Sequence, residues 1–290
     1  MNADSSAAEI SNIKIREIAG QKELRAVEEL QKEVWKIADL DVIPLTQLAA
    51  AQAAGGVLLG AFDGETLAGF AYGFPGCEHG RATHHSHMLA IKPAYRRFNL
   101  GYRLKLTQRG RVLAQGITEM TWTFDPLQSL NAYFNFCKLG VTADRYFVNF
   151  YGDEATSFLH RSGTDRLWVT WHLDSNRVKE RIEKKVRAIE LANVRTLVKL
   201  GENNTPCVAD LAENLTDEQV AIEIPADINE LQKQNIESAI EWREATRKAF
   251  TEALEQGYIV KEFYRMNKDN QQLGLYLLNR KSWAASLEIV

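Results

Sequence analysis

The amino-acid sequence predicts an α/β fold in which a mixed, mostly antiparallel central sheet is flanked by helices, with a smaller α+β module at the C-terminal end. Three observations favour this fold class. Strand-like and helical apolar patterns follow one another over residues 1–174. The pair Asp63-Gly64, a strong hairpin signal, joins two of the strand-like runs. After Ser175 the sequence becomes more charged, and a second series of elements follows.

The first elements are defined by apolar spacing and by Gly and Pro. Isoleucines alternate over residues 13–18 as on a short strand, and apolar side chains recur at helical spacing over residues 23–34. Pro44 starts a second helix, and Gly55 ends it. Residues 57–74 then hold the two antiparallel strands of the hairpin.

The next elements complete a series in the order β-α-α-β-β-β-α-β-α-β-β. They are expected at residues 86–91 (strand), 101–115 (helix), 119–124 (strand), 130–139 (helix), 146–150 (strand) and 166–173 (strand). Pro93 closes the first of these strands, Asp125-Pro126 closes the second, and Gly140 ends the later helix.

The composition changes after this series, which divides the chain into three regions. A first domain is expected over residues 1–174, a charged helix and linker over 175–206, and an α+β module over 207–290. Within the last two regions, the expected elements are a helical stretch over 177–200, a strand over 220–224, a long helix over 227–257, and strands over 259–264 and 273–278. This module has no basic loop, so we expect it to cover an active site or to form a dimer surface.

The composition is that of an ordinary globular protein. Its net charge of −3 gives no general attraction to nucleic acid or anionic membrane. Cys77, Cys137 and Cys207 lack the spacing of metal ligands, so no metal is expected. Without a membrane-length apolar run or an export signal, the chain is expected to be cytoplasmic, with neither a membrane nor a nucleic acid as partner.

One segment departs from this acidic balance. No acidic residue lies between Glu78 and Glu119. Eight basic residues lie there: Arg81, Lys92, Arg96, Arg97, Arg103, Lys105, Arg109 and Arg111. The segment also contains an expected helix start at Gly101, where free backbone N–H groups favour phosphate. It therefore predicts a local site for a diphosphate, and the alternative is a basic helix that faces solvent.

The order of the elements and the motif at residues 89–102 resemble the acyl-coenzyme A (CoA) loop of the GNAT superfamily of acyltransferases. Arg96, Asn99 and Gly101 occupy the three motif positions, with Asn99 where the family usually has glycine. The resemblance implies a GNAT-type fold over about residues 13–173 and a loop that binds acetyl-CoA or succinyl-CoA. The implied contacts are Leu89, Ala90, Ile91, Arg96, Arg97, Phe98, Asn99, Leu100, Gly101 and Tyr102.

A second stretch, residues 131–141, is similar to the later helix of that family. The resemblance implies cofactor contacts from Asn131, Phe134 and Lys138. Phe136 stands where the family frequently has a tyrosine that protonates the leaving thiolate. Tyr133, three positions earlier, is the substitute that we expect, and the alternative is a packed aromatic side chain.

Three histidines precede the loop and are candidates for a general base. On a strand, His85 and His87 share a face with Leu89. The attacking amine must be neutral, and a base with a pKa near the working pH is an efficient way to make it so. The alternatives are a surface histidine cluster or a chain of water molecules in place of a base. A backbone N–H near Leu89 is expected to polarise the thioester carbonyl.

The stretches 123–129, 146–152 and 162–168 resemble the branch of the superfamily associated with o-succinylbenzoate synthase and N-acylamino-acid racemase. That branch implies N-acylation, often N-succinylation, of an amino acid. A substrate carboxylate needs a cationic partner, and Arg166 is the candidate. The alternative is an Asp165–Arg166 pair that anchors a turn. Asp125 is a second substrate-site candidate, and its alternative is to end a strand.

These observations predict an acyl-CoA-dependent N-acyltransferase that moves an acetyl or succinyl group onto a small-molecule amine by direct attack. A cysteine-linked route is less favoured, because no activating group adjoins Cys77 or Cys137. The alternative function is a non-catalytic protein that binds acyl-CoA as a sensor. Nucleic-acid binding is weaker still, because aromatic and basic residues do not interleave along residues 96–111.

Overall fold

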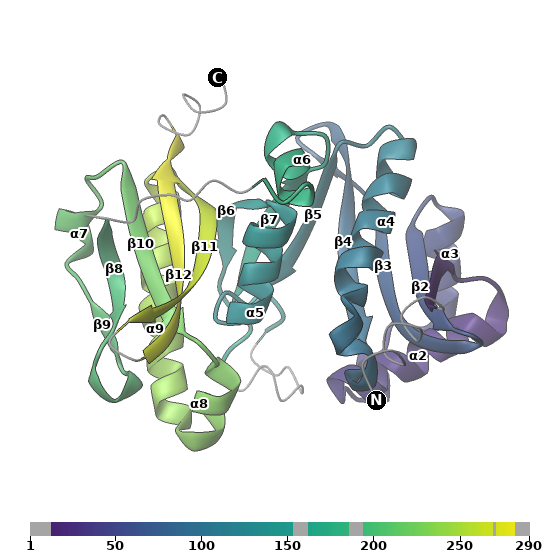
Figure 1. The fold of residues 1–290 in the computed structure, drawn as a ribbon, viewed down its shortest axis with the longest axis horizontal. Helices are drawn as coiled ribbons and strands as arrows, with labels where there is room; N and C mark the ends of the chain where they lie inside the picture. The colour runs from purple at the N-terminus through teal and green to yellow at the C-terminus, as the bar shows by residue number, and fades with distance from the viewer. Residues whose placement is uncertain (1–12, 153–161, 186–193, 269–270, 282–290) are drawn as a thin grey trace, which may run out of the picture. The chain divides into compact units, whose positions relative to one another are not determined.

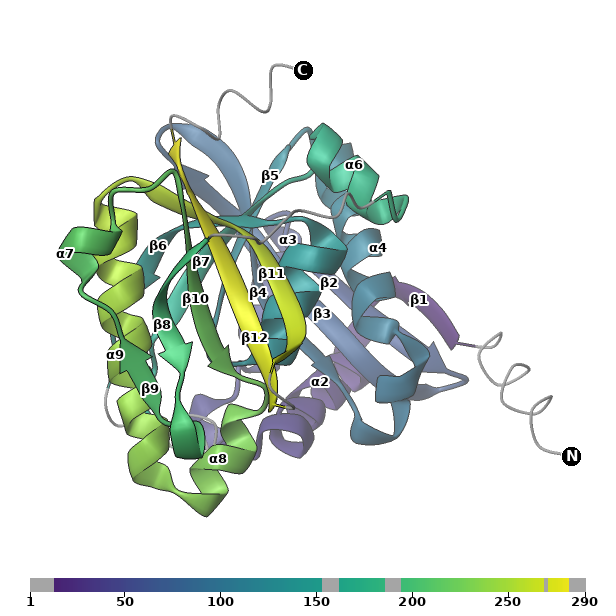
Figure 2. The same ribbon diagram turned by 60° about the vertical axis from the view of Figure 1, so that its left-hand side comes forward.

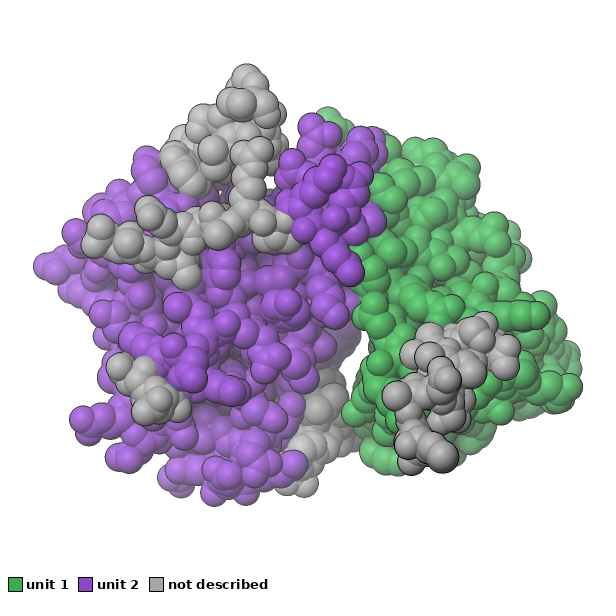
Figure 3. Space-filling model, in the orientation of Figure 1, with its two compact units in different colours: residues 1–122, 156–158 green, residues 123–155, 159–290 purple. Residues whose placement is uncertain are grey.

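The computed structural model describes residues 13–152, 162–185, 194–268 and 271–281. Contacts between residues divide this chain into two compact units, one extending to Trp122 and one beginning at Thr123 (Figure 3). Both units carry a mixed and mostly antiparallel sheet flanked by helices, which confirms the predicted fold class. The division falls inside a strand, whereas the sequence predicted a domain boundary after residue 174, and that functional division stays a prediction.

The described residues of the first unit form five strands, the last of which ends in the second unit. They are β1 (Ile13–Glu17), β2 (Val57–Asp63), β3 (Thr66–Glu78), β4 (Arg81–Ile91) and β5 (Glu119–Phe124). Neighbouring strands pair in this order, antiparallel except for the parallel pair β4 and β5. The hairpin at Asp63-Gly64 is confirmed. β4 begins five residues earlier than predicted, because polar residues at its start hide the strand pattern.

Helices cover both faces of this sheet, since β2 and the first half of β3 are buried on both sides. The helical elements are α2 (Gly20–Trp35), the 3-10 turn η1 (Asp39–Asp41), α3 (Leu45–Ala53), the 3-10 helix η2 (Pro93–Phe98) and α4 (Leu100–Ala114) (Figure 1). Apolar residues of α2 and α3 form one core with β2 and β3, which includes Leu30, Phe70 and Tyr72. α4 packs on the other face.

The second unit begins with the end of β5 and a short helical segment. α5 (Ser129–Ala132) continues directly into a π-helix, η3 (Tyr133–Leu139), which Gly140 ends in a left-handed conformation with φ of 77°. The predicted end at Gly140 is therefore confirmed. The winding was not predicted, because a π-turn leaves no simple signal in sequence.

In the part of the second unit that the structure describes, seven strands form the sheet, in the order β7-β6-β11-β12-β10-β8-β9. Their bounds are β6 (Thr142–Phe147), β7 (Arg166–His172), β8 (Arg195–Leu200), β9 (Pro206–Val208), β10 (Gln219–Pro225), β11 (Tyr258–Lys268) and β12 (Gln271–Arg280) (Figure 2). β8 and β10 are parallel, and the other pairs are antiparallel. The strand predicted at 146–150 is shifted to earlier residues.

The helices of this unit correct two predictions. They are α6 (Asn176–Ile182), η5 (Glu202–Asn204), α7 (Leu211–Asn214), α8 (Ile228–Gln234) and α9 (Ile236–Glu255). The long helix expected over 227–257 is broken at Asn235, which caps α9 by accepting from the Ser238 N–H. Residues 195–200, expected as helical, form β8 because Leu197 and Val198 are buried in the sheet.

Two further observations concern the described residues. No helix among them has the length and apolar content needed to cross a membrane. Within the same residues, His, Cys, Asp and Glu side chains nowhere gather in a group of three that could hold a metal ion.

Candidate functional site

The predicted loop of the first unit is a strand, a tight turn and a helix. β4 ends at Ile91, the 3-10 helix η2 follows, and α4 begins at Leu100. Asn99 connects the two helices with φ of 55° and ψ of 26°, a left-handed conformation. Asparagine is one of the few residues that adopt this conformation readily. The turn therefore forms although Asn99 replaces the glycine that the GNAT motif usually has at this position.

The start of α4 presents free backbone donors. The first hydrogen bond into this helix runs from the Arg103 N–H to the Asn99 carbonyl, at 3.2 Å. The N–H groups of residues 100–102 therefore have no acceptor within the helix, and the Asn99 side chain does not cap them. Such groups, together with the helix dipole, favour an anion.

Gly101 keeps the approach to these donors open. A Cβ added at Gly101 would have the Leu89 Cδ2 atom as its nearest neighbour, at 3.7 Å, an ordinary contact. Packing within the chain therefore does not require glycine here. The missing side chain leaves room beside the helix start, where a ligand could approach the backbone closely.

The basic residues of this segment divide into several roles. Lys92 lies 3.0 Å from the Glu33 carboxylate, and Arg103 donates to the Ile13 carbonyl oxygen at 2.8 Å. Arg111 lies 3.3 Å from Glu17. The eight charges are thus not one anion site, because several already have partners.

Two of the eight basic residues, Arg96 and Arg97, lie at the turn itself. Arg96 is exposed and has no partner among the described residues, and the Arg97 guanidinium lies 4.7 Å from the centre of the Phe98 ring. Arg96 is therefore the cation best placed to meet an anion at the Asn99 turn.

The pairing of β4 with β5 ends partway along β4. Its parallel pairing with β5 joins His84 to Met120 and His85 to Thr121, and the described register goes no further. On the other side, β4 carries a bulge between the pairs Tyr72–Met88 and Phe74–His85. The backbone of β4 after His85 therefore has an edge that is not paired with β5, next to a bulge of the kind found at active sites.

His85 and His87 share a face of β4, as predicted. Their rings are 6.1 Å apart, and Phe74 lies 5.5 Å from the first and 5.8 Å from the second. The His85 Nδ1 atom lies 3.1 Å from the Thr121 hydroxyl. Both imidazoles are partly buried, so the alternative of an exposed histidine cluster is not what the structure has.

Burial makes these imidazoles weak bases. Burial, together with smaller effects of charge on His87 and Lys105, lowers the pKa of His85 to about 4. Burial also lowers the pKa of His87. The His85 ring is therefore neutral near pH 7 and can accept a proton, although its pKa is below the range in which a general base is most effective.

The opposite face of β4 carries a polar cluster that sequence reasoning missed. The Lys105 Nζ atom of α4 donates to Ser86 Oγ at 2.7 Å, and the Ser86 hydroxyl donates to Gln108 Oε1 at 2.8 Å. His84 lies on the same face, fully buried. A signal was present, because Lys105 and Gln108 share a helical face with Leu104 and Val112, where apolar residues are expected.

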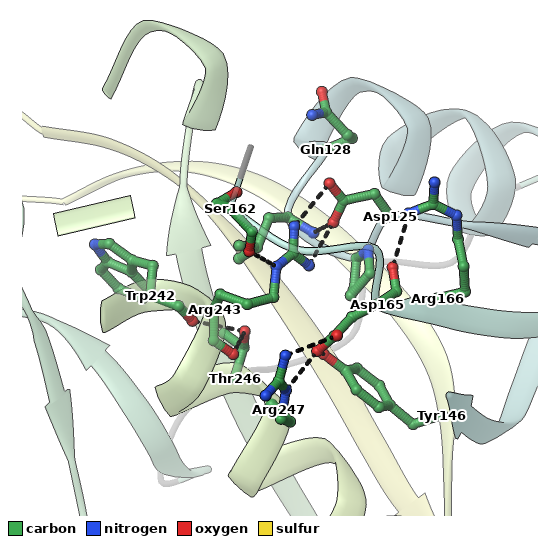
Figure 4. Close-up of polar contacts among 12 residues, drawn as sticks. Asp125, Gln128, Tyr146, Ser162, Asp165, Arg166, Trp242, Arg243, Thr246 and Arg247 are labelled. Carbon is green, nitrogen blue, oxygen red and sulfur yellow. Dashed lines mark hydrogen bonds and ion pairs between the residues drawn. The ribbon is translucent and has the colours of Figure 1, made fainter. Parts of the chain in front are cut away.

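In the second unit, Asp125 is part of a buried ion pair (Figure 4). Its two carboxylate oxygens accept from the two terminal nitrogens of Arg243 at 2.7 and 2.9 Å. The Arg243 Nε–H donates to the Ser162 carbonyl, and Asp125 also accepts from the Leu127 N–H. Asp125 therefore stabilises the turn after β5 and contacts α9. Its role is more than to end a strand, which was the alternative interpretation of the sequence.

The buried carboxylate of Asp165 forms a second ion pair, with the partly buried Arg247. The distances to Arg247 are 2.8 and 2.9 Å, and the Tyr146 hydroxyl donates to the same carboxylate at 2.7 Å. Arg166 donates to the backbone oxygen of Asp165 (Figure 4). Its guanidinium also lies over the Tyr151 ring. The carboxylate of Asp165 is thus held by Arg247, which the sequence could not pair with it across 82 positions.

The helix predicted to contribute further contacts is the α5–η3 segment. Asn131 and Lys138 are exposed on it, and Phe134 is partly buried. Tyr133 is 37% exposed while Phe136 is fully buried, so the two do not share a face as expected. The reason is the π-winding, which places more residues in each turn than an α-helix.

Comparisons with known proteins find similarity in structure alone. A scan against protein-family models gives no match, and a search of curated proteins gives none. Among solved structures, a ribosomal-protein-S18-alanine N-acetyltransferase from Escherichia coli is 13% identical, with 56% of this chain and 94% of that chain covered and a TM-score of 0.44.

Two other solved structures are similar to the same degree. An aminoglycoside 6'-acetyltransferase type Ii is 20% identical, covering 55% of this chain and 97% of its own, with a TM-score of 0.44. A GNAT family acetyltransferase from Elizabethkingia anophelis with acetyl-CoA bound is 15% identical, covering 56% and 98%, with a TM-score of 0.42. Identities and TM-scores this low assign neither a family nor an activity to the chain.

Proposed function

We propose that the protein is an acyl-CoA-dependent N-acyltransferase that transfers an acetyl or succinyl group to a small-molecule amine, with an amino acid as the expected acceptor. The observation that carries the proposal is the corner formed by β4, Asn99 and α4. Free N–H groups, an unpaired Arg96 and the open approach at Gly101 meet there. A diphosphate, which is anionic and accepts several hydrogen bonds, suits this corner.

The unpaired edge of β4 gives the remaining part of such a ligand a place to lie. Backbone groups between Ser86 and Ile91 can bond an extended chain there as a neighbouring strand would, and an N–H near Leu89 would polarise a carbonyl. The acyl-CoA would supply an activated acyl group as a thioester, whose sulfur leaves readily because a thiol has a pKa of about 8.5. Little acid assistance is then needed, although Phe136 replaces a tyrosine.

His85 is the group that would accept the proton from the attacking amine, with Thr121 orienting its ring. A route through an acyl-cysteine is disfavoured, because burial raises the pKa of Cys137 to about 11 and leaves its thiol protonated. Direct attack by the amine on the thioester is therefore proposed. Tyr133 stays a prediction as the acid.

Arg166 is proposed as the partner of an acceptor carboxylate. Asp125 is proposed to act through the turn that it holds, because both its oxygens are already bound to Arg243. The contacts predicted from Asn131, Phe134 and Lys138, a role for the C-terminal module in covering the site or forming a dimer, and a cytoplasmic location all stay predictions.

A second candidate function is an acyl-CoA sensor without turnover. It is favoured by two observations, the low pKa of His85 and the buried Phe136 in place of a tyrosine. The two functions differ in chemistry, because a sensor binds acyl-CoA but releases no free thiol with any amine.

The binding claim is tested with a pair of glycine variants in α4. Gly101→Ala adds a methyl group at the proposed site without a clash, and Gly110→Ala adds one where nothing lies within 4 Å. Both changes stabilise a helix by about 0.5–1 kcal/mol. Calorimetric titration with CoA should show binding to the wild type and to Gly110→Ala, and at least about tenfold weaker binding to Gly101→Ala, equivalent to about 1.4 kcal/mol.

Turnover is tested by measuring free thiol released from acetyl-CoA and succinyl-CoA with a panel of amino acids, in the wild type and in His85→Ala. Transferase activity predicts thiol release with at least one pair, and slower release in His85→Ala. CoA binding with no thiol release supports the sensor. Equal CoA affinity in Gly101→Ala and Gly110→Ala overturns the proposed site.

A further inference from the structure

A buried polar cluster lies between α4 and the face of β4 opposite His85. We call its members, Ser86, Lys105, Gln108 and His84, the Lys105 cluster. All four are buried, with exposed fractions of 3%, 3%, 0% and 0%. The Lys105 Nζ atom also lies 3.6 Å from the centre of the Trp122 ring. The cluster therefore connects β4 and α4 with Trp122 of β5, within the first unit.

The hydrogen bonds within this cluster do not use all of its N–H donors. Lys105 has up to three N–H groups, and one is bonded, to Ser86. The Gln108 amide nitrogen and both ring nitrogens of His84 are buried without a partner. Among the described residues, no carboxylate pairs with Lys105. A buried polar group without a partner is costly, and an excess of donors requires an acceptor.

Gly73 of β3 allows these donors to converge. A Cβ there would lie 2.4 Å from His84 Nε2 and 3.0 Å from Gln108 Nε2. Any side chain at this position would therefore displace one or both. Because glycine lets both nitrogens approach one point, the unpartnered atoms of β4 and α4 lie close together.

The cluster also lies where β4 loses its neighbour. The last β4–β5 pair is His85 with Thr121, and Ser86 and Trp122 are the next residues of the two strands. Lys105 contacts both of them. In the proposed function, an extended ligand lies along β4 from the α4 end, so the acyl group would point toward this place.

We propose that the Lys105 cluster binds a terminal carboxylate on the acyl group, so that the enzyme uses the CoA thioester of a short dicarboxylic acid. This inference rests on the proposed function and selects between its two donors. A carboxylate is an acceptor only, so it can satisfy the Lys105, Gln108 and His84 donors together. It also supplies the counter-charge that Lys105 lacks.

The proposal has a linked effect on protonation. Burial lowers the pKa of Lys105 well below its usual value, because desolvation disfavours the ammonium form. A bound carboxylate favours the ammonium form, and binding should take up a proton. A cluster that holds only water, or Lys105 acting as a proton acceptor during transfer, predicts no such dependence on the acyl tail.

The test compares succinyl-CoA with butyryl-CoA, whose four-carbon acyl chain ends in a methyl group instead of a carboxylate. Calorimetry of the full chain should show succinyl-CoA bound about 10- to 100-fold more tightly, the range expected for hydrogen bonds to a charged group. Titrations in buffers of different ionisation enthalpy should show proton uptake with succinyl-CoA and none with butyryl-CoA.

Lys105→Met should abolish both the preference and the proton uptake, while binding of free CoA stays unchanged. Ser86→Ala should reduce the preference in part, and it serves as the second variant if Lys105→Met does not fold. The control is Lys22→Met, because that side chain is 91% exposed. Equal affinity for the two thioesters, or a preference that survives in Lys105→Met, overturns the proposal but leaves the proposed function standing. No binding of CoA at all overturns both.

Discussion

Two buried cations in this chain have opposite surroundings. Arg243, in the second unit, donates from both terminal nitrogens to the Asp125 carboxylate. Its Nε–H donates to the Ser162 carbonyl. Lys105, in the first unit, contacts the Ser86 hydroxyl and the Trp122 ring, and it has no carboxylate partner among the described residues. Burial acts against the charge of Arg243, but the Asp125 carboxylate raises its pKa above the usual value. At Lys105 burial acts unopposed and lowers the pKa.

The difference separates a structural ion pair from a candidate binding site. A buried charge that is fully paired holds its elements in place, and nothing remains for a ligand to do. A buried amine with surplus donors around it is incomplete in the free protein. The following predictions test that contrast, from the largest effect to the smallest.

Removing the counter-charge of Arg243 should have the largest effect. Asp125→Asn preserves size but leaves a buried guanidinium unpaired, so we expect a loss of about 3–5 kcal/mol in the free energy of unfolding. Urea unfolding measures it. The exposed pair Arg16–Glu23 provides the control, and Glu23→Gln should cost less than about 1 kcal/mol. Similar losses in both variants would contradict the role given to Asp125.

Acid should destabilise the first unit through His84. Burial and the nearby Lys105 lower its pKa to about 4, against 6.5 for an ordinary histidine. The unfolded chain therefore binds this proton first, and stability falls as the pH drops from about 6.5 to about 4, by about 3 kcal/mol in total. His84→Leu should remove that share of the fall. The measurement is the unfolding free energy of the wild type and of His84→Leu across this pH range. Parallel curves for the two proteins would contradict the prediction.

Lys105→Met should behave unlike the loss of Asp125. The change replaces an uncompensated buried amine with an apolar chain of similar length, so the unfolding free energy at pH 7 should lie within about 1 kcal/mol of the wild type, on the stabilising side. The advantage should grow as the pH falls, because the wild type then has to keep the amine neutral or bury its charge. A loss of more than about 2 kcal/mol would mean that Lys105 is a structural residue, as Arg243 is.

The smallest effect concerns the glycines of α4. Gly101→Ala and Gly110→Ala should each raise the free energy of unfolding by about 0.5–1 kcal/mol, because neither methyl group meets an obstacle. Thermal unfolding without ligand measures both changes. A loss of stability in Gly101→Ala alone would show that packing, and not ligand access, requires this glycine.

Local patterns predicted much of the fold, and distant contacts account for what they missed. The Asp63-Gly64 turn and the apolar alternation around it identified β2 and β3. The break at Asn235 was missed because an apolar pattern continues across it. β8 was missed because its flanking charges suggested a helix.

The candidate site shows the same limit. His85 and His87 share a face because a strand has a period of two, which sequence reveals directly. The pairing of Asp125 with Arg243 spans 118 positions, and nothing local indicates it. Lys105 was counted among the cations for a diphosphate, although its position on the buried face of α4 directs it inward. Charge alone does not tell which way a side chain points.

The most direct test of the account is a crystal structure of the full chain with CoA bound. The account predicts the diphosphate at the start of α4, with its oxygens about 3 Å from backbone N–H groups of residues 100–102 and the Arg96 guanidinium beside them. CoA found elsewhere on the chain, or a helix start closed by packed side chains, would contradict it.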